Sequence, residues 1–363
     1  MATFRKFIPA VEFHPGITLA EKLQEMRMSI KEFALRTSKP EKTIHAVIGG
    51  SSSVTSDMAV AFENVTKIPA HFWLNLQKGY DEYVARRKRE MQLESDYAWA
   101  CLFPVSEMTD LGWLPTADTK EKTAHAMFSF FQVSTAKAWQ DYYMNQQLKV
   151  AFRISLNGIN DPYATSAWLR RGEIQASEMT VEEFSDKTLR EAIPAMKALC
   201  AEQPENFAEA LQEMCAAAGV KLVYTEGLQN APINGATRWL KDTPCIQMSG
   251  RLNRNDRFWF TFFHELGHIL LHGKKDIFLE DINYPDRQTK KEEEANAFAS
   301  RTLLPQAAEK EIAKAGDYSA DAIRRYAEKY KTHPGIIAGR LQHKGLIPKE
   351  GYADLFEAVV LFR

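Results

Sequence analysis

Two histidines four residues apart, with a glutamate directly after the first, are the residues whose types and spacing most clearly predict chemistry. They are His264, Glu265 and His268 in the stretch FTFFHELGHILLHG. Positions i and i+4 of a helix lie on one face, so the two imidazoles can bind one metal ion. Glu265 is rotated by about 100 degrees from His264, so it can miss the metal and act as a general base on water. The pattern therefore predicts zinc-dependent hydrolysis.

The alternative is an ordinary buried helix that happens to contain two histidines. From typical residue frequencies, H-E-x-x-H arises by chance on the order of one time in a hundred in a chain of this length. Chance is therefore a poor explanation. Two histidines are nevertheless an incomplete site, because a catalytic zinc takes a third protein ligand.

The segment KKEEEANAFAS supplies the candidates for that third ligand. Glu292 is in line with a predicted buried helical stripe, whereas Glu293 points away from it. Glu292 is therefore predicted as the third ligand, with Glu294 as the second choice. One turn later, Asn296 can accept a hydrogen bond from a ligand histidine. The alternative for KKEEE is a solvated run of charges. The residues of the stripe are Ala295, Phe298, Ala299, Thr302 and Leu303.

Three further residues are predicted to have supporting roles or are candidates for them. His272 lies on the helix of the two histidines and is predicted to be structural or to support a ligand. Tyr284 and His333 could each stabilise an oxyanion, and nothing in the sequence selects between them.

The first ninety or so residues predict a second kind of site. Five short helices with tight turns are expected, and the three- or four-residue turn between the second and third is typical of a helix-turn-helix domain. Ser29 and Glu32 predict a capping box at the start of the second helix. The charged helix YDEYVARRKREMQLESDY is expected to lead out of this domain. The runs that predict the five helices are LAEKLQEMRMS, IKEFALRTS, PEKTIHAVI and two within SSSVTSDMAVAFENVTKIPAHFWLNLQ.

The run PEKTIHAVI is the expected recognition helix, whose N-terminal part would face the major groove. Ile44 and Val47 are expected to pack inward. Because the outward surface is only weakly basic, a protein-interaction module without DNA binding is the alternative. The residues predicted to lie near operator DNA are Lys39, Glu41, Lys42, Thr43 and His45.

The rest of the chain predicts a mainly helical α+β protein. Residues 97–202 are mostly amphipathic helix, and VKLVYTE, ATRWL and CIQMSG read as short strands, with Lys241–Pro244 as a turn. We predict a helix-turn-helix domain over 1–92, a helical middle segment over 93–205, and a peptidase domain with a C-terminal helical extension over 206–363.

The composition excludes several classes of protein. The 46 basic and 47 acidic residues balance, so a basic surface can only be local. The four cysteines are far apart and fit reduced thiols. With no signal peptide and no long apolar run, we expect a cytoplasmic protein without a membrane segment.

The residues also resemble known families. FWFTFFHELGHILLHG and EEEANAFASRTLLP resemble the zinc-binding core of the ImmA/IrrE-type metallopeptidases, and the likeness covers most of the chain after about residue 95. The resemblance implies a gluzincin site of His264, His268 and Glu292. Asn296 departs from it, since many relatives have aspartate there. AVEFHPGITLAEKLQEMRMSIKEFA resembles HigA-type antitoxins, which implies a dimer that binds operator DNA and, in some operons, a toxin.

The expected function is a transcriptional regulator with a zinc endopeptidase domain that cleaves a helix-turn-helix repressor, another regulatory protein or itself, in a response to stress or mobile elements. The alternative is a DNA-binding antitoxin or repressor whose peptidase-like domain senses or binds without turnover. The two hypotheses differ in what a change at Glu265 would do.

Overall fold

The structure is a computed structural model that describes residues 13–147, 161–251, 253–273, 278–279 and 286–362. Contacts between residues divide the chain into two compact units, Met1–Ser95 and Asp96–Arg363. The predicted separation of residues 93–205 from 206–363 stays a prediction.

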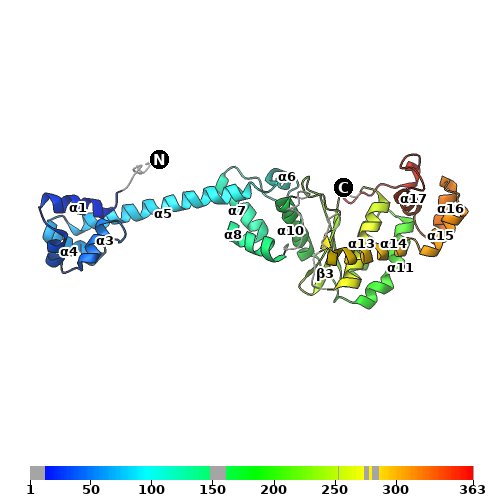
Figure 1. The fold of residues 1–363 in the computed structure, drawn as a ribbon, viewed down its shortest axis with the longest axis horizontal. Helices are drawn as coiled ribbons and strands as arrows, with labels where there is room; N and C mark the ends of the chain where they lie inside the picture. Colours follow the sequence, from blue (N-terminus) through cyan, green and yellow to red (C-terminus); the bar gives the residue numbers. More distant parts are fainter. Residues whose placement is uncertain (1–12, 148–160, 252, 274–277, 280–285, 363) are drawn as a thin grey trace, which may run out of the picture. The chain divides into compact units, whose positions relative to one another are not determined.

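The first unit is entirely helical in its described part, as the sequence predicts. Its core contains Phe33, Phe62 and Trp73, which are fully buried. Of the expected capping box, Ser29 Oγ accepts a hydrogen bond from Glu32 N at 3.1 Å, while the Glu32 carboxylate pairs with Arg36 instead. The helices, coloured blue to cyan in Figure 1, are α1 (Pro15–Glu25), α2 (Ile30–Thr37), α3 (Glu41–Ile48), α4 (Ser56–Thr66) and α5 (Ala70–Ala100).

The fifth helix is longer than predicted. The expected short helix and the charged helix YDEYVARRKREMQLESDY are one continuous element, α5, of 31 residues. No proline interrupts the run after Pro69, and one glycine, Gly79, costs a helix only about 1 kcal/mol. Arg86 pairs with Glu82 one turn earlier, a spacing that further stabilises an exposed helix.

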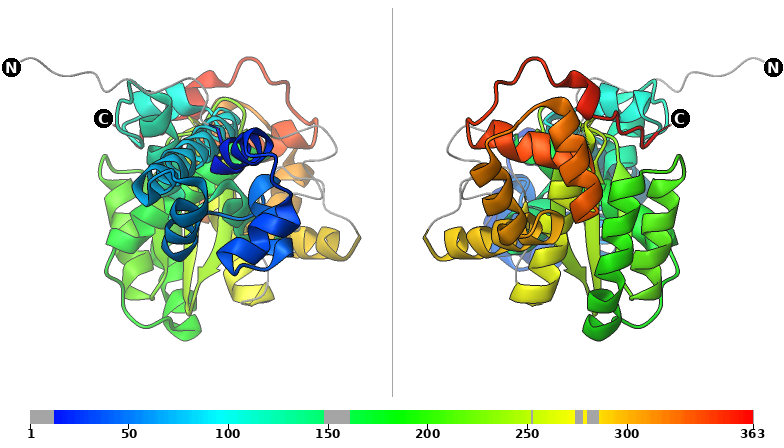
Figure 2. Two further views of the ribbon diagram at one scale, coloured as in Figure 1. Left: turned by 90° about the vertical axis from the view of Figure 1, so that its left-hand side faces the viewer. Right: turned by 90° about the vertical axis from the view of Figure 1, so that its right-hand side faces the viewer.

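Helices also dominate the second unit. In Figure 2, α11 and α12 lie next to each other beside the sheet, in green. The described helices before the sheet are α6 (Val105–Asp110), α7 (Lys120–Phe131), α8 (Ala136–Trp139), the π-helix η1 (Gln140–Gln147), α10 (Pro162–Glu178), α11 (Asp186–Glu202) and α12 (Phe207–Ala217). Those after it are α13 (Asn255–His272), α14 (Asp286–Leu303), α15 (Gln306–Ala315), α16 (Ala320–Tyr330), α17 (Pro334–His343) and the 3-10 turn η2 (Ala353–Leu355).

A small mixed sheet lies between these helices. Its strands are β1 (Lys221–Thr225), β2 (Gly235–Leu240), β3 (Thr243–Ser249) and β4 (Phe278–Leu279), in the order β1-β3-β2-β4. β1 is parallel to β3, and β2 is antiparallel to both β3 and β4. Ile246 and Met248 pack into the core that contains α12 and α13, and Gln247 between them contacts α10 at Gly172. The sheet thus has helices on both faces, which confirms the predicted fold class.

The turn between β2 and β3 is tighter than predicted. Leu240 pairs directly with Thr243, so only Lys241 and Asp242 form the turn, and Lys241 has a φ of 60 degrees. Pro244 lies inside β3, opposite Trp239. β3 pairs with β1 only from Cys245 onward, so Pro244 lies where no β1 residue needs its missing amide hydrogen.

Two helices of the second unit, α13 and α14, pack closely against each other (Figure 1). Gly267 makes this possible. A Cβ atom there would lie 3.1 Å from Phe298 Cδ1 and 3.3 Å from the Ala295 backbone. Since real Cβ contacts are rarely that short, a larger residue would push α14 outward.

The composition led us to expect no membrane segment and reduced cysteines. No helix among them is both long and apolar enough to cross a membrane. All four cysteines are free thiols, with Cys101 exposed and the others buried.

Candidate metal centre

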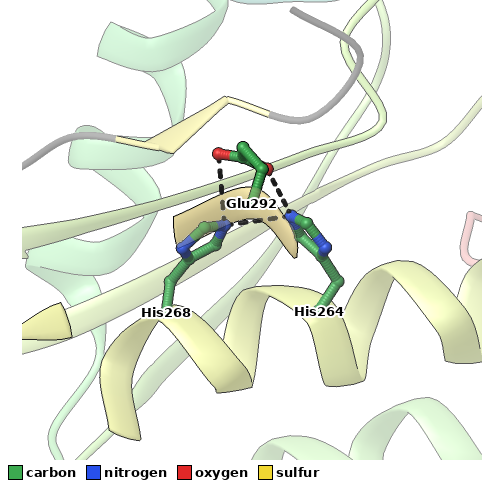
Figure 3. A group of neighbouring side chains, drawn as sticks. All are labelled: His264, His268 and Glu292. Atoms are coloured by element: carbon green, nitrogen blue, oxygen red, sulfur yellow. Dashed lines mark hydrogen bonds and ion pairs between the residues drawn. The ribbon is translucent and has the colours of Figure 1, made fainter. Parts of the chain in front are cut away.

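Three of the predicted residues converge on one point. His264 and His268 rise from α13, and Glu292 reaches them from α14 (Figure 3). The two histidine Nε2 atoms are 2.9 Å apart, and Glu292 Oε2 lies 3.1 Å from His264 Nε2. Glu292 Oε1 lies 3.5 Å from His268 Nε2. The histidine side chains are 3% and 0% exposed and that of Glu292 is 18% exposed, so the group is largely removed from water.

A hydrogen bond sets the tautomer of His264. Its Nδ1 atom lies 3.0 Å from Asn296 Oδ1, which can only accept. His264 Nδ1 must therefore carry the proton, and Nε2 keeps its lone pair toward Glu292. Asn296 thus holds the position that the sequence predicts for it.

A longer chain of contacts orients His268. Its Nδ1 atom lies 3.0 Å from His272 Nδ1, and His272 Nε2 lies 3.1 Å from Glu294 Oε2. Because the Glu294 carboxylate accepts from His272 Nε2, a neutral His272 has its lone pair at Nδ1 and accepts there from His268. His268 Nε2 then also faces inward with a lone pair. The sequence left Glu294 open as a ligand, but the structure places it on His272, outside the converging group.

Burial and charge favour the ligand forms of these groups. Burial lowers the pKa of His268 to about 4, so its imidazole is neutral at pH 7. Burial alone would raise the pKa of Glu292, but hydrogen bonds from His264 and His268, when their Nε2 atoms carry protons, outweigh burial and lower that pKa to about 2. A metal ion would take the place of those protons. A neutral imidazole and an ionised carboxylate are the forms that bind a cation.

The donor set fits a zinc ion. Tetrahedral bonds of 2.0–2.2 Å imply separations of about 3.3–3.6 Å between ligand atoms, close to the 2.9, 3.1 and 3.5 Å found here. The ligand atoms of His264, His268 and Glu292 all lie within 4.8 Å of one another. Three lone-pair donors facing one another in a buried site repel, and a cation between them would remove that repulsion.

Glu265 lies against strand β2, on another side of α13. The side chain is fully buried, and a Cβ atom at Gly235 would lie 2.8 Å from Glu265 Oε1. The Thr237 hydroxyl donates to the Glu265 carbonyl at 3.0 Å. Gly235 and Thr237 therefore fix the turn of α13 that carries Glu265. No sequence motif points to Gly235 or Thr237, because their role depends on how β2 packs on α13 and not on their spacing from the histidines.

A cavity of about 520 Å³ opens beside the group. Phe260, Thr261 and Asn296 line the part next to the histidine-bearing turns of α13, and basic side chains line another part: Arg257, Arg340 and Lys344. Its volume lies within the range of small-molecule and peptide pockets.

The structure gives His333 a different place from these residues. His333 caps the N-terminus of α17, where its Nδ1 accepts a hydrogen bond from Gly335 N at 3.0 Å. Its Nε2 lies 3.2 Å from Glu357 Oε1. Both ring nitrogens are thus engaged at a helix end. Tyr284, the other residue considered for an oxyanion, lies outside the described residues.

The predicted DNA-contacting residues lie around the start of α3. Ile44 and Val47 are fully buried, as expected. Lys42 and His45 are exposed, and His45 Nε2 lies 3.8 Å from Glu41 Oε1 on the preceding turn. Thr43 is half-buried, and the Lys39 ammonium pairs with Asp57 on α4. Of this set, Lys42 is the cation for which the structure shows no ion pair among the described residues.

Replacing Asn296 is expected to change metal affinity without touching a ligand. Asn296→Ala removes the acceptor that orients His264, and such losses typically weaken metal binding about 10- to 100-fold. Asn296→Asp restores an acceptor with charge and should bind at least as tightly as wild type. Competition with a fluorescent zinc chelator measures both affinities, and equal affinity of Asn296→Ala and wild type would contradict this role.

The chain is similar to known proteins in two regions. Residues 215–342 match the family described as Peptidase_M78, the IrrE N-terminal-like domain. An HTH-type transcriptional regulator of Escherichia coli strain K12, YddM, is 30% identical over 66 residues, which cover 18% of this chain and 70% of YddM. The chain belongs to the HTH-type transcriptional regulators. This regulator also carries a metallopeptidase-type domain, from the last turn of α12 to α17, that contains the converging group.

Antitoxins are among the solved structures that are similar to the regulator. An addiction module antidote protein of the HigA family from Coxiella burnetii is 33% identical, with 23% of this chain and 91% of that chain covered and a TM-score of 0.22. Antitoxin HigA of Pseudomonas aeruginosa, solved with the higBA promoter, is 27% identical, with 23% and 94% covered and a TM-score of 0.22.

Proposed function

We propose that this HTH-type regulator is a zinc-dependent endopeptidase that cleaves a regulatory protein. The observation that carries the proposal is the convergence of His264 Nε2, His268 Nε2 and the Glu292 carboxylate in a buried site. When bound, zinc would activate water and polarise the peptide carbonyl. The match to the IrrE N-terminal-like domain supports the same reaction class.

Each residue near the group has a role in this proposal. His264, His268 and Glu292 hold the metal, while Asn296 and His272 keep the two imidazoles in the required tautomer. Glu265 takes a proton from the attacking water and delivers it to the leaving amine, as a general base and then a general acid. The cavity beside α13 would receive the substrate chain.

The substrate is proposed to be a helix-turn-helix repressor, another regulator or this protein itself. The test is incubation of purified protein with candidate regulators encoded nearby, followed by intact-mass analysis. Discrete fragments that require added zinc and disappear with a chelator would support the proposal. Intact masses for all partners and for the protein itself, in a sample with about one zinc per chain, would contradict it.

We further propose that the first unit binds operator DNA through α3, as a homodimer in the cytoplasm. The similarity to YddM, an HTH-type transcriptional regulator, supports DNA binding. A cognate toxin is the second partner to test. If DNA binding occurs without any turnover, the second domain would act as a sensing or interaction module, which is the alternative function.

Charge reversal at Lys42 is expected to weaken operator binding about 10-fold. Lys42 is exposed at the N-terminal part of α3, where a cation would neutralise one phosphate in each protomer, so Lys42→Glu should also lower the salt dependence of binding by about two ions per homodimer. Fluorescence anisotropy with DNA from upstream of the gene measures both. Lys78→Glu, an exposed change on α5, is the control. Equal losses for both variants would place the DNA interface elsewhere.

A further inference from the structure

A second cavity, of about 830 Å³, lies in the helical segment before the sheet and has no role in the proposed peptidase reaction. Helices α7 and α10 and the loop between α6 and α7 line it. Its volume falls in the range of sites that bind small molecules. The lining includes Trp113, Ser129, Phe130, Arg170, Arg171 and Ile174.

The apolar part of the cavity is a continuation of a well-packed core. Trp113 is 7% exposed and Phe130 is 6% exposed, and both belong to the cluster that holds α7 and α10 together. Arg170 Nε donates to the Phe130 carbonyl at 2.8 Å, which fixes the two helices relative to each other. The walls are therefore held in place by packing, as a preformed pocket requires.

The charged part of the cavity has more positive than negative charge. Arg170 pairs with Glu173 at 2.8 Å, but Glu173 also pairs with Arg238 at 3.0 Å, so one carboxylate serves two guanidinium groups. Arg238 is 4% exposed, so water offsets little of its charge. The other charged lining residues, Lys122 and Glu121, are exposed side chains on the first turn of α7.

Arg171 adds a further cation without a described counterion. Its guanidinium carbon lies 6.0 Å from the centre of the Trp113 ring, which holds the head group beside an aromatic wall. Among the described residues, nothing accepts a hydrogen bond from its buried Nε. No carboxylate of the described part lies within ion-pair distance of Arg171 either. The guanidinium charge of Arg171 is therefore not neutralised by a described carboxylate, and an anion in the cavity would pair with it.

We propose that this cavity binds a small organic molecule with one carboxylate and an aromatic body. The carboxylate would lie on Arg171, with the surplus charge of the Arg170–Glu173–Arg238 cluster adding attraction. The aromatic body would lie between Trp113, Phe130 and Ile174. A planar carboxylate matches the fork of a guanidinium group, and the aromatic walls favour a flat apolar partner.

Three pairs of compounds test the proposal on the full-length protein: phenylacetate, indole-3-acetate and 1-naphthylacetate, each against its primary amide. Isothermal titration calorimetry measures the dissociation constants. At least one acid should bind at least 10-fold more tightly than its amide, because the amide keeps the shape and loses the charge. Failure of all three acids to bind, or equal binding of acid and amide, would overturn the proposal.

Two variants assign the binding to this cavity. Arg171→Gln should weaken the best acid at least 10-fold and leave its amide unchanged. Ser129→Trp, a change at an exposed position of α7 that lines the cavity, should block both by filling space. Arg324→Gln on α16, an exposed arginine paired with Asp321, is the matched control. Circular dichroism checks that each variant is folded. If Arg171→Gln is unfolded, the binding result for Ser129→Trp decides whether the ligand lies in this cavity. Wild-type affinity in Ser129→Trp would place the binding site elsewhere.

Discussion

Glu265→Gln is expected to slow proteolysis by about 10²- to 10⁴-fold, the usual contribution of a positioned general acid–base. The amide has nearly the shape of the carboxylate but cannot take a proton from water. Glu265 is fully buried against Gly235 of β2, where a larger residue would not fit, and glutamine avoids that problem. The change should therefore leave zinc content and the melting temperature close to those of wild type.

Intact-mass analysis of a time course measures this effect on whichever regulator wild type cleaves. Glu213→Gln on the exposed side of α12 is the matched control and should cleave at the wild-type rate. Wild-type cleavage by Glu265→Gln would show that another group is the base. Gene regulation that is unchanged in Glu265→Gln cells would instead favour the alternative of a DNA-binding regulator without turnover.

Replacing both histidines, His264→Ala with His268→Ala, is expected to reduce bound zinc from about one per chain to a background level. The change leaves Glu292 as a single carboxylate, and one carboxylate does not form a structural or catalytic zinc site. Metal analysis after gel filtration measures the ratio. His71→Ala, an exposed histidine of the first unit, is the control for non-specific binding.

The zinc content of the double variant and of two glutamate variants tests which residues hold the metal. Zinc that remains at one per chain in the double variant would place the metal at other residues and remove the basis of the peptidase proposal. Loss of zinc in Glu292→Gln as well would support a three-ligand site. Unchanged zinc in Glu294→Gln would agree with its contact to His272, outside the group.

Much of the candidate site follows from periodicity. Helical spacing puts His264 and His268 on one face, and the stripe of Ala295, Ala299 and Leu303, all buried in the structure, points Glu292 inward. Both rules are local, so they apply before any tertiary contact is known. The role of Glu294 depends on the distance between two helices, and sequence spacing carries no such information.

In the fold, too, features set by local sequence were predictable, whereas features set by contacts between distant segments were not. The strands β1, β2 and β3 lie where the sequence predicts them, but β4 was not predicted, α5 continues through the predicted boundary helix, and Pro244 lies in β3 instead of a turn. A proline is usually evidence against a strand, and only the missing β1 neighbour at that position makes it acceptable. The surplus of arginine over carboxylate at the second cavity likewise arises from α10 and β2 coming together.

The two-helix origin of the ligands has a consequence for folding. His264 and His268 come from α13 and Glu292 from α14, so a shared ion would tie together two helices whose closest approach depends on Gly267. A cross-link of a loop of this general length restricts the unfolded chain by about 3–4 kcal/mol in the chain-entropy model. Bound metal would thus stabilise the contact between α13 and α14, and its loss would loosen α14 as well as abolish the proposed catalysis.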